Sequence, residues 1–303
     1  MPELDATSGA GVVDARVRLP LDRRPAQGRP AAMARQQYDD VLDMSAKVAA
    51  GTTEALMRQL HESGVTRAVV HAENEGDEDV AALNAATAAF VAEHPTMLSG
   101  FGTVTMPPPT AGTGAREVRE CAAAGLIGVN IQPAFFGMDT IDRRLYPAYA
   151  AAEESGLAVA LHTGINYSRV YPMSHERPAF LDQVACDFPD LTLIACHGGW
   201  PWVAEYCAVA RRHPTVMLEL GGLAPKYVMR PGTGWDVLGT LAGTLLRDQV
   251  LFATDWPIMD HARALHEWRA SGLRPDAVEA ILGGNARRLL GGPGLRCPAE
   301  VPA

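Results

Sequence analysis

Three short segments carry side chains that can transfer protons, and each is followed by residues that favour a turn. They are Leu161-His162-Thr163-Gly164, Cys196-His197-Gly198-Gly199 and Thr254-Asp255-Trp256-Pro257. An imidazole accepts and returns a proton near neutral pH, so histidine is the commonest general acid or base. We therefore expect His162, His197 and Asp255 to be catalytic. The alternatives are a helix-capping role for His197 and a buried structural pair for the other two.

Two arginines, Arg16 and Arg18, stand near the end of the first apolar run, residues 12–19. A guanidinium keeps its charge and binds a carboxylate through two parallel hydrogen bonds. Alternation alone indicates the wet face of a half-exposed strand. In a closed parallel barrel, however, inward positions are seldom solvated except at the catalytic end. There Arg16 is expected to be catalytic and Arg18 to bind substrate.

The elements that must position these residues alternate between short β-rich runs and Ala-rich helical stretches. Eight strands, each followed by a helix, predict an α/β fold of the (β/α)8 TIM-barrel type. The predicted strands are 12–18, 68–71, 98–104, 128–132, 158–162, 191–197, 216–220 and 250–255. The predicted helices are 53–63, 79–93, 115–124, 146–155, 177–188, 202–212, 235–246, 262–271 and 275–290.

More polar residues fall at the C-terminal ends of the predicted strands, where such barrels carry their active sites. His71 and Glu73 follow the second strand, and Asn130 and Gln132 end the fourth. We expect these four side chains to bind substrate. Thr103, Thr105 and Glu219 fall at equivalent places.

The aromatic residues Trp200 and Trp256 follow His197 and Asp255 in the chain. They are predicted to line a substrate pocket, with packing beneath the loops as the alternative. Cys196 neighbours His197, so strand alternation points its thiol away from the barrel centre.

Composition bounds the class of protein. A chain of 303 residues with 48% hydrophobic content can bury one large core, and its net charge of −9 disfavours nucleic acid and anionic membranes as partners. No apolar run spans a bilayer, and residues 1–11 lack the order of a signal peptide, which predicts a cytoplasmic protein. The five cysteines show no Cys-x-x-Cys spacing and are interpreted as reduced thiols.

Domain organisation is expected to be simple. Residues 11–291 are predicted to form one barrel, with a flexible N-terminus at 1–10 and a C-terminal tail at 292–303. Two long connections follow strands, at residues 20–50 and 221–235. Loops of this length are often lids or binding loops.

From residue 14 to residue 290 the chain resembles the amidohydrolase-2 branch of the amidohydrolase superfamily. That branch includes aminocarboxymuconate semialdehyde decarboxylase, resorcylate decarboxylases and pyrone dicarboxylate lactonase. The resemblance is strongest at His197-Gly198-Gly199, at Thr254-Asp255-Trp256-Pro257 and at residues 281–290. It implies that His162 and Asp255 correspond to metal ligands, that His197 is the base, and that the protein is a homodimer.

Family members usually begin with Asp-x-His-x-His, whose two histidines complete the metal site. Here the pair reads Arg16 and Arg18. A guanidinium has no lone pair to offer a cation, and His162 with Asp255 falls short of the three protein ligands typical of catalytic zinc. We therefore predict no metal and no other cofactor. Instead, the arginines are expected to lie beside Asp255, lower its pKa and keep it ionised.

These expectations combine into a metal-independent enzyme that acts on a small carboxylated substrate. The first interpretation is hydrolysis of a lactone, ester or amide, with His197 as acid or base and the arginines on a carboxylate or oxyanion. Three alternatives stay open: a decarboxylase or other lyase, a metal-dependent hydrolase with a rearranged site, and a binding protein without activity.

Overall fold

The computed structural model describes residues 11–20, 29–76 and 78–290, and it confirms the TIM barrel. Eight parallel strands pair in sequential order, each with the next. Backbone hydrogen bonds from Ala15 to Phe252 (2.9 Å) and from Arg18 to Trp256 (2.8 Å) join the first strand to the last segment of the barrel. The strands are β1 Val12–Arg18, β2 Val65–His71, β3 Leu98–Thr103, β4 Gly128–Ile131, β5 Ala158–His162, β6 Leu193–Cys196, β7 Val216–Glu219 and β8 Val250–Leu251.

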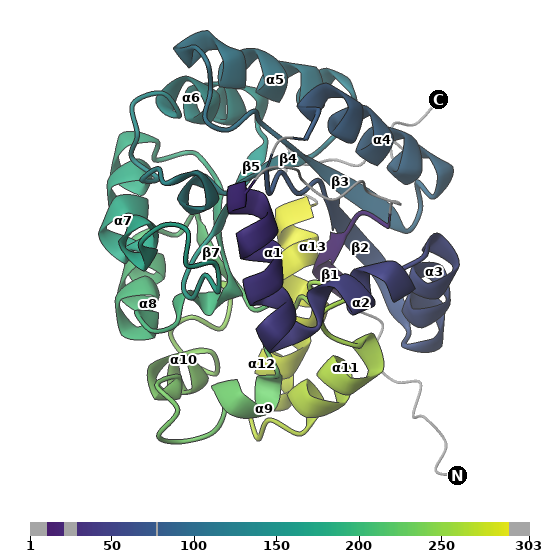
Figure 1. The fold of residues 1–303 in the computed structure, drawn as a ribbon. Helices are drawn as coiled ribbons and strands as arrows, with labels where there is room; N and C mark the ends of the chain where they lie inside the picture. The colour runs from purple at the N-terminus through teal and green to yellow at the C-terminus, as the bar shows by residue number, and fades with distance from the viewer. Residues whose placement is uncertain (1–10, 21–28, 77, 291–303) are drawn as a thin grey trace, which may run out of the picture.

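Helices form a ring around the strands (Figure 1). The larger ones carry an apolar face that packs on the sheet, as the Leu56 and Leu60 pair of α3 illustrates. Those that follow predicted helical patterns are α3 Thr53–Glu62, α4 Val80–Glu93, α5 Ala111–Ala123, α6 Tyr146–Ser155, α7 Pro178–Asp187, α8 Val203–Arg212, α10 Asp236–Leu241 and α11 His261–Arg269.

The predicted helix over residues 275–290 is interrupted. It begins as α12, Pro275–Glu279, passes through a π-helical turn, Ala280–Gly284, and ends as α13, Asn285–Leu290. A Cβ at Gly283 would come within 2.4 Å of the backbone oxygen of Gly11. The turn therefore lets the chain pass close to the start of β1, where Ala286 and Leu290 of α13 pack into the barrel interior.

Strand β1 contains an irregularity that sets the direction of its arginines. Asp14 pairs with Ala68 and Val17 with Val70, so β1 uses one residue more than β2 between these pairs. Such a bulge lets two successive residues face the same way. Ala15 packs with the barrel interior, and Arg16 also contacts residues there. Val17 then turns outward into the strand–helix core.

The long connection at residues 20–50 is not an irregular loop. Within the described residues it forms α1, Arg29–Leu42, and α2, Met44–Ala50. Alanine and glutamine favour helix over coil, which is the signal that the loop prediction overlooked. Helix α1 crosses the centre of the helical ring (Figure 1). Tyr38 on α1 stacks on Phe135 and meets Tyr167 edge-on, so α1 covers the loops after β4 and β5.

Three further predictions concern the remaining segments. The connection at residues 221–235 contains a short helix, α9 Pro225–Val228. The ends predicted to be flexible, 1–10 and 292–303, lie outside the described residues. Of the helices that the structure describes, none has the length and apolar character to cross a bilayer.

Candidate active site

Arg16 lies at the centre of the barrel, with 1% of its surface exposed. Its guanidinium forms ion pairs with Glu73 and with Glu219 (3.2 Å). It also donates to the Asn130 side-chain oxygen at 3.2 Å and to the Cys196 sulfur at 2.9 Å. These partners engage all three guanidinium nitrogens. Arg16 is therefore buried and fully paired with protein groups, and its expected part in catalysis stays a prediction.

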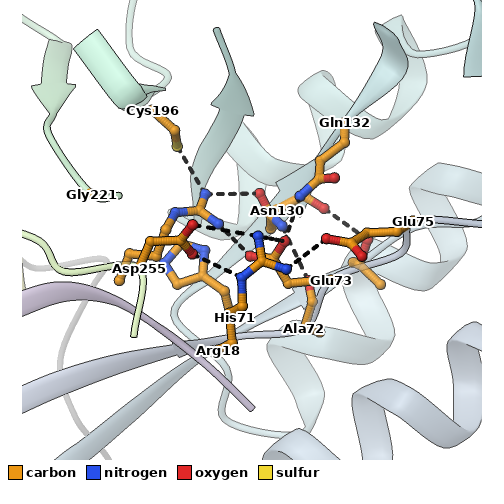
Figure 2. A network of polar contacts seen from close by, with 12 residues as sticks. Arg18, His71, Ala72, Glu73, Glu75, Asn130, Gln132, Cys196, Gly221 and Asp255 are labelled. Carbon is orange, nitrogen blue, oxygen red and sulfur yellow. Dashed lines mark hydrogen bonds and ion pairs between the residues drawn. The ribbon is translucent and has the colours of Figure 1, made fainter. Parts of the chain in front are cut away.

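Arg18 lies one layer nearer the open end of the barrel, and its side chain is 14% exposed. Its Nε donates to Asp255 Oδ1 at 3.1 Å, and a terminal nitrogen approaches Asp255 Oδ2 at 3.4 Å. The other terminal nitrogen donates to Glu75 at 2.6 Å. Figure 2 shows Arg18 held between Asp255 and Glu75. The predicted pairing of an arginine with Asp255 is thus made by Arg18.

Burial and charge act in opposite directions on the carboxyl groups of this cluster. For Glu73 burial would raise the pKa, but Arg18 and Arg16 hold it well below the usual range. Burial raises the pKa of Glu219 to about 7. Burial also raises the pKa of Asp255, although Arg18 lowers it. The expected lowering of the Asp255 pKa is therefore wrong in its net direction, because the predicted ion pair lies in a buried environment.

His197 is held in a defined tautomer beside this cluster. Its Nδ1 lies 2.8 Å from the carbonyl oxygen of Gly221, which can only accept, so Nδ1 carries the proton and Nε2 keeps its lone pair. Burial lowers the pKa of His197 well below its usual value, and the neighbouring His162 and Arg16 lower it further. His197 is thus a neutral imidazole with an open acceptor, as a general base requires.

The backbone is strained at two of the expected catalytic residues. His197 has φ of 64° and Asp255 has φ of 51°, in the left-handed region that side chains with a Cβ seldom adopt. A Cβ added at Gly222 would lie 3.5 Å from Asp255 Oδ2 and 3.8 Å from His197 Nδ1, so both residues border the same glycine. Strain of this kind concentrates at functional sites.

The His162 ring is oriented by Glu176, a residue that the sequence did not indicate. Its Nδ1 forms a short contact with Glu176, whose side chain is buried. Phe135 meets the His162 ring edge-on, and the ring of His197 lies 4.8 Å from it, centre to centre. The structure therefore brings His162 and His197 together as predicted.

The other predicted binding residues form the walls beneath Arg18. Gln132 donates to Glu73 at 2.8 Å, and Asn130 bridges Arg16 and the Ala72 carbonyl oxygen. His71 donates through Nε2 to the Ala15 carbonyl oxygen at 3.0 Å and stacks on Phe101. The carboxylate of Glu73 forms ion pairs with both Arg16 and Arg18. These four residues lie around the arginine cluster.

An apolar cleft of about 320 Å³ lies among the connections that follow β5, β6 and β7. It is lined by Ile165, Tyr167, Trp200, Leu223, Ala224, Tyr227, Val228, Thr233 and Trp235. Trp235 also borders Gly198, the residue after His197. Trp200 thus has the predicted place, whereas Trp256 is 2% exposed and packs in the hydrophobic core. The position of Trp256 next to Asp255 in the sequence does not reveal that its side chain packs against Gly51.

Cys196 corrects a further prediction. Its thiol points into the barrel interior and meets Arg16, because His197, and not Cys196, leaves the strand geometry through its left-handed backbone. Burial raises the pKa of Cys196 far above its usual value, so the thiol stays protonated. Glu75 and Glu176 were missed entirely. Each lies in a loop beyond a strand end, where alternation gives no signal.

The residues at the expected metal position do not fit a metal ion. Arg16 and Arg18 direct charged N–H groups toward Glu73, Glu219 and Asp255, the carboxylates that a cation would otherwise need. Among the described residues, the group of three or more ligand-type side chains close enough to hold an ion lies elsewhere, at Asp182, Cys186 and His213. Guanidinium N–H groups, which cannot ligate a cation, lie among the carboxylates of Glu73, Glu219 and Asp255.

Comparisons with known proteins give a consistent family. An amidohydrolase family model matches residues 13–292. An uncharacterised TIM-barrel protein from Bordetella bronchiseptica is 28% identical, with 92% of this chain and 98% of that chain covered and a TM-score of 0.74. No curated protein gives a significant match.

Two decarboxylases share the fold at lower identity. One is 5-carboxyvanillate decarboxylase from Sphingomonas paucimobilis, at 19% identity, coverage of 93% and 99%, and a TM-score of 0.67. The other is 5-carboxyvanillate decarboxylase from Novosphingobium aromaticivorans, solved with manganese, at 13% identity, coverage of 94% and 97%, and a TM-score of 0.69. The family match spans nearly all of the barrel described above, and the chain belongs to the amidohydrolase family.

Proposed function

We propose that this protein is a metal-independent decarboxylase of a small carboxylated, hydroxyl-bearing ring compound. The observation that carries the proposal is the surplus of carboxyl groups around the two guanidiniums. Glu73, Glu75, Glu219 and Asp255 all lie within 3.6 Å of Arg16 or Arg18. A substrate carboxylate held at Arg18 lies among these negative charges, and its own charge is removed from the site when it leaves as neutral CO2.

Arg18 is the anchor for that carboxylate, because it is the partly exposed member of the arginine pair. The ring would occupy the apolar cleft near Gly198, where Trp200 and Trp235 offer aromatic faces. In this binding mode the reacting carbon would face His197 and Asp255, the two residues that border Gly222.

Each of these two residues has a defined part in the reaction. His197, neutral and open at Nε2, accepts the proton of a ring hydroxyl, which drives electron density onto the carbon that bears the carboxylate. Asp255, once it holds a proton, gives that proton to the same carbon. The bond to the carboxylate then breaks, its electron pair restores the ring, and CO2 leaves. His197 returns its proton to the ring oxygen, and Asp255 regains one from water.

Hydrolysis of a lactone or ester is a second candidate, and the tautomer of His197 favours it. Nε2 can take a proton directly from a water molecule, and Arg18 can stabilise the developing oxyanion. Hydrolysis transfers no proton to a carbon atom, so it needs no acid for that step. It therefore makes no use of the raised pKa of Asp255.

The experiment that tests the proposal uses protein stripped of metal, with the metal content measured by mass spectrometry. The protein is incubated in D2O with 2,6-dihydroxybenzoate, 5-carboxyvanillate and a panel of aryl lactones, and the products are followed by NMR. The expected result is a ring in which deuterium replaces the carboxylate. Activity that appears only after a divalent metal is added would contradict metal independence. Ring opening of the lactones without CO2 release would favour hydrolysis.

A further inference from the structure

Resting on the proposed function, we propose that Glu75 is an internal competitor for the substrate carboxylate at Arg18 and sets the affinity of the site for anionic ligands. Glu75 stands four residues beyond the end of β2, where its side chain reaches back to the guanidinium. The contact of 2.6 Å occupies the terminal nitrogen that Asp255 leaves open.

The three carboxylates around Arg18 differ in how easily they can leave. The side chains of Asp255 and Glu73 are 5% and 1% exposed, whereas that of Glu75 is 37% exposed. A buried carboxylate that loses its cation is left without water, at a cost of several kcal/mol. A half-exposed carboxylate regains its hydration when it swings away. Glu75 is therefore the group that a ligand displaces.

The exchange conserves charge at Arg18. One carboxylate replaces another on the same nitrogen, so the guanidinium never loses its counter-charge. The net cost is the ion pair between Arg18 and Glu75, and partly exposed pairs are weak. In the absence of ligand, Glu75 keeps Arg18 oriented and neutralised. A ligand carboxylate binds to Arg18 only by displacing Glu75 from this ion pair.

Equilibrium binding of benzoate tests this proposal without requiring turnover. Benzoate carries the carboxylate but no ring hydroxyl, and its affinity is measured by calorimetry for the wild-type protein, Glu75→Gln and Glu62→Gln. Glu62 is an exposed residue at the end of α3, beyond the opposite end of β2, and serves as the matched control. Benzamide, which has the same shape without the charge, is measured alongside.

The expected result is that Glu75→Gln binds benzoate about two- to fivefold more tightly than wild type. Glu62→Gln and the affinity for benzamide should be unchanged. Unchanged or weaker benzoate binding in Glu75→Gln overturns the proposal, as does an equal gain for benzamide. Tighter benzoate binding in a protein that turns over no substrate would refute the proposed reaction and leave the role of Glu75 intact. A circular-dichroism melting curve verifies that the variant is folded.

Discussion

Arg16 and Arg18 are two residues apart on one strand, yet they belong to different parts of the molecule. Arg16 is 1% exposed and surrounded by protein groups, while the side chain of Arg18 is 14% exposed and shares its charge with a half-exposed carboxylate. The inner arginine is enclosed by protein groups, and the outer one is paired with a carboxylate that reaches solvent. The depth of each arginine in the barrel, and not its residue type, distinguishes the two.

The largest expected effect follows from removing the inner charge. Arg16→Met leaves Glu219 buried without a cation and leaves Glu73 with Arg18 alone, so we expect the free energy of unfolding to fall by about 3–5 kcal/mol. Urea denaturation measures this loss. Arg144→Met, which removes an exposed guanidinium paired with Asp142, is the control and should leave the free energy of unfolding nearly unchanged. An Arg16→Met protein of wild-type stability would abolish the distinction between the two arginines.

The second effect depends on pH. The folded protein binds a proton at Glu219 more tightly than the unfolded chain, because the pKa is raised from 4.5 to about 7. The stabilisation by that proton is complete below about pH 4.5 and is lost as the pH rises through about 7. Glu219→Gln stays neutral, so its stability relative to wild type should rise between pH 5 and pH 8, by at most about 3 kcal/mol.

Urea denaturation at both pH values measures that difference. Glu93→Gln, at the exposed end of α4, is the control and should show no such trend. If the stability difference between Glu219→Gln and wild type is the same at pH 5 and pH 8, Glu219 does not titrate in this range. The residues around Arg16 would then keep a fixed charge.

The third prediction moves to the outer region. His197→Asn should lower kcat about 100-fold, since a general base is lost, and should change the unfolding free energy by less than about 1 kcal/mol. Asparagine tolerates the left-handed backbone at this position. Because burial lowers the pKa of His197, the wild-type rate should not fall between pH 8 and pH 6.5 through protonation of this base. Steady-state kinetics over this range test both points, and a kcat equal to wild type would exclude His197 as the base.

The smallest effect comes from a matched pair of conservative changes. Arg18→Lys keeps the charge but loses the paired hydrogen bonds, so KM for the carboxylate substrate should rise about tenfold with little loss of stability. Arg16→Lys cannot serve Glu73, Glu219, Asn130 and Cys196 together and should instead lower the melting temperature. Similar kinetic and melting profiles for the two variants would contradict the division between inner and outer arginines.

Much of the fold could be predicted because it depends on local patterns. The ranges of β1 and β5 were predicted to the residue, since apolar β-branched runs bounded by turns are strong strand signals. The segments around His162, His197 and Asp255 were found because their turn residues mark strand ends. Helix α1 was missed, because the length of the connection was given more weight than its helix-favouring alanine and glutamine residues.

The arrangement of the site was harder to predict, because its partners are far apart in the chain. The groups around Arg16 come from the region of β2, β4, β6 and β7, and no local pattern pairs them. Burial, which reverses the expected shift in the Asp255 pKa, also arises only from the assembled barrel. The predicted homodimer and cytoplasmic location stay predictions.

The bulge in β1 has a consequence for how this barrel could change its chemistry. Positions 16 and 18 point inward because the backbone gains one residue between Asp14 and Val17, whatever side chains stand there. Regular alternation over the same residues, without the bulge, would turn both side chains toward the helices. Substitution of the side chains alone would leave their direction unchanged. Point mutations at positions 16 and 18 can therefore put either a cationic centre or a pair of imidazoles at the same place in the barrel.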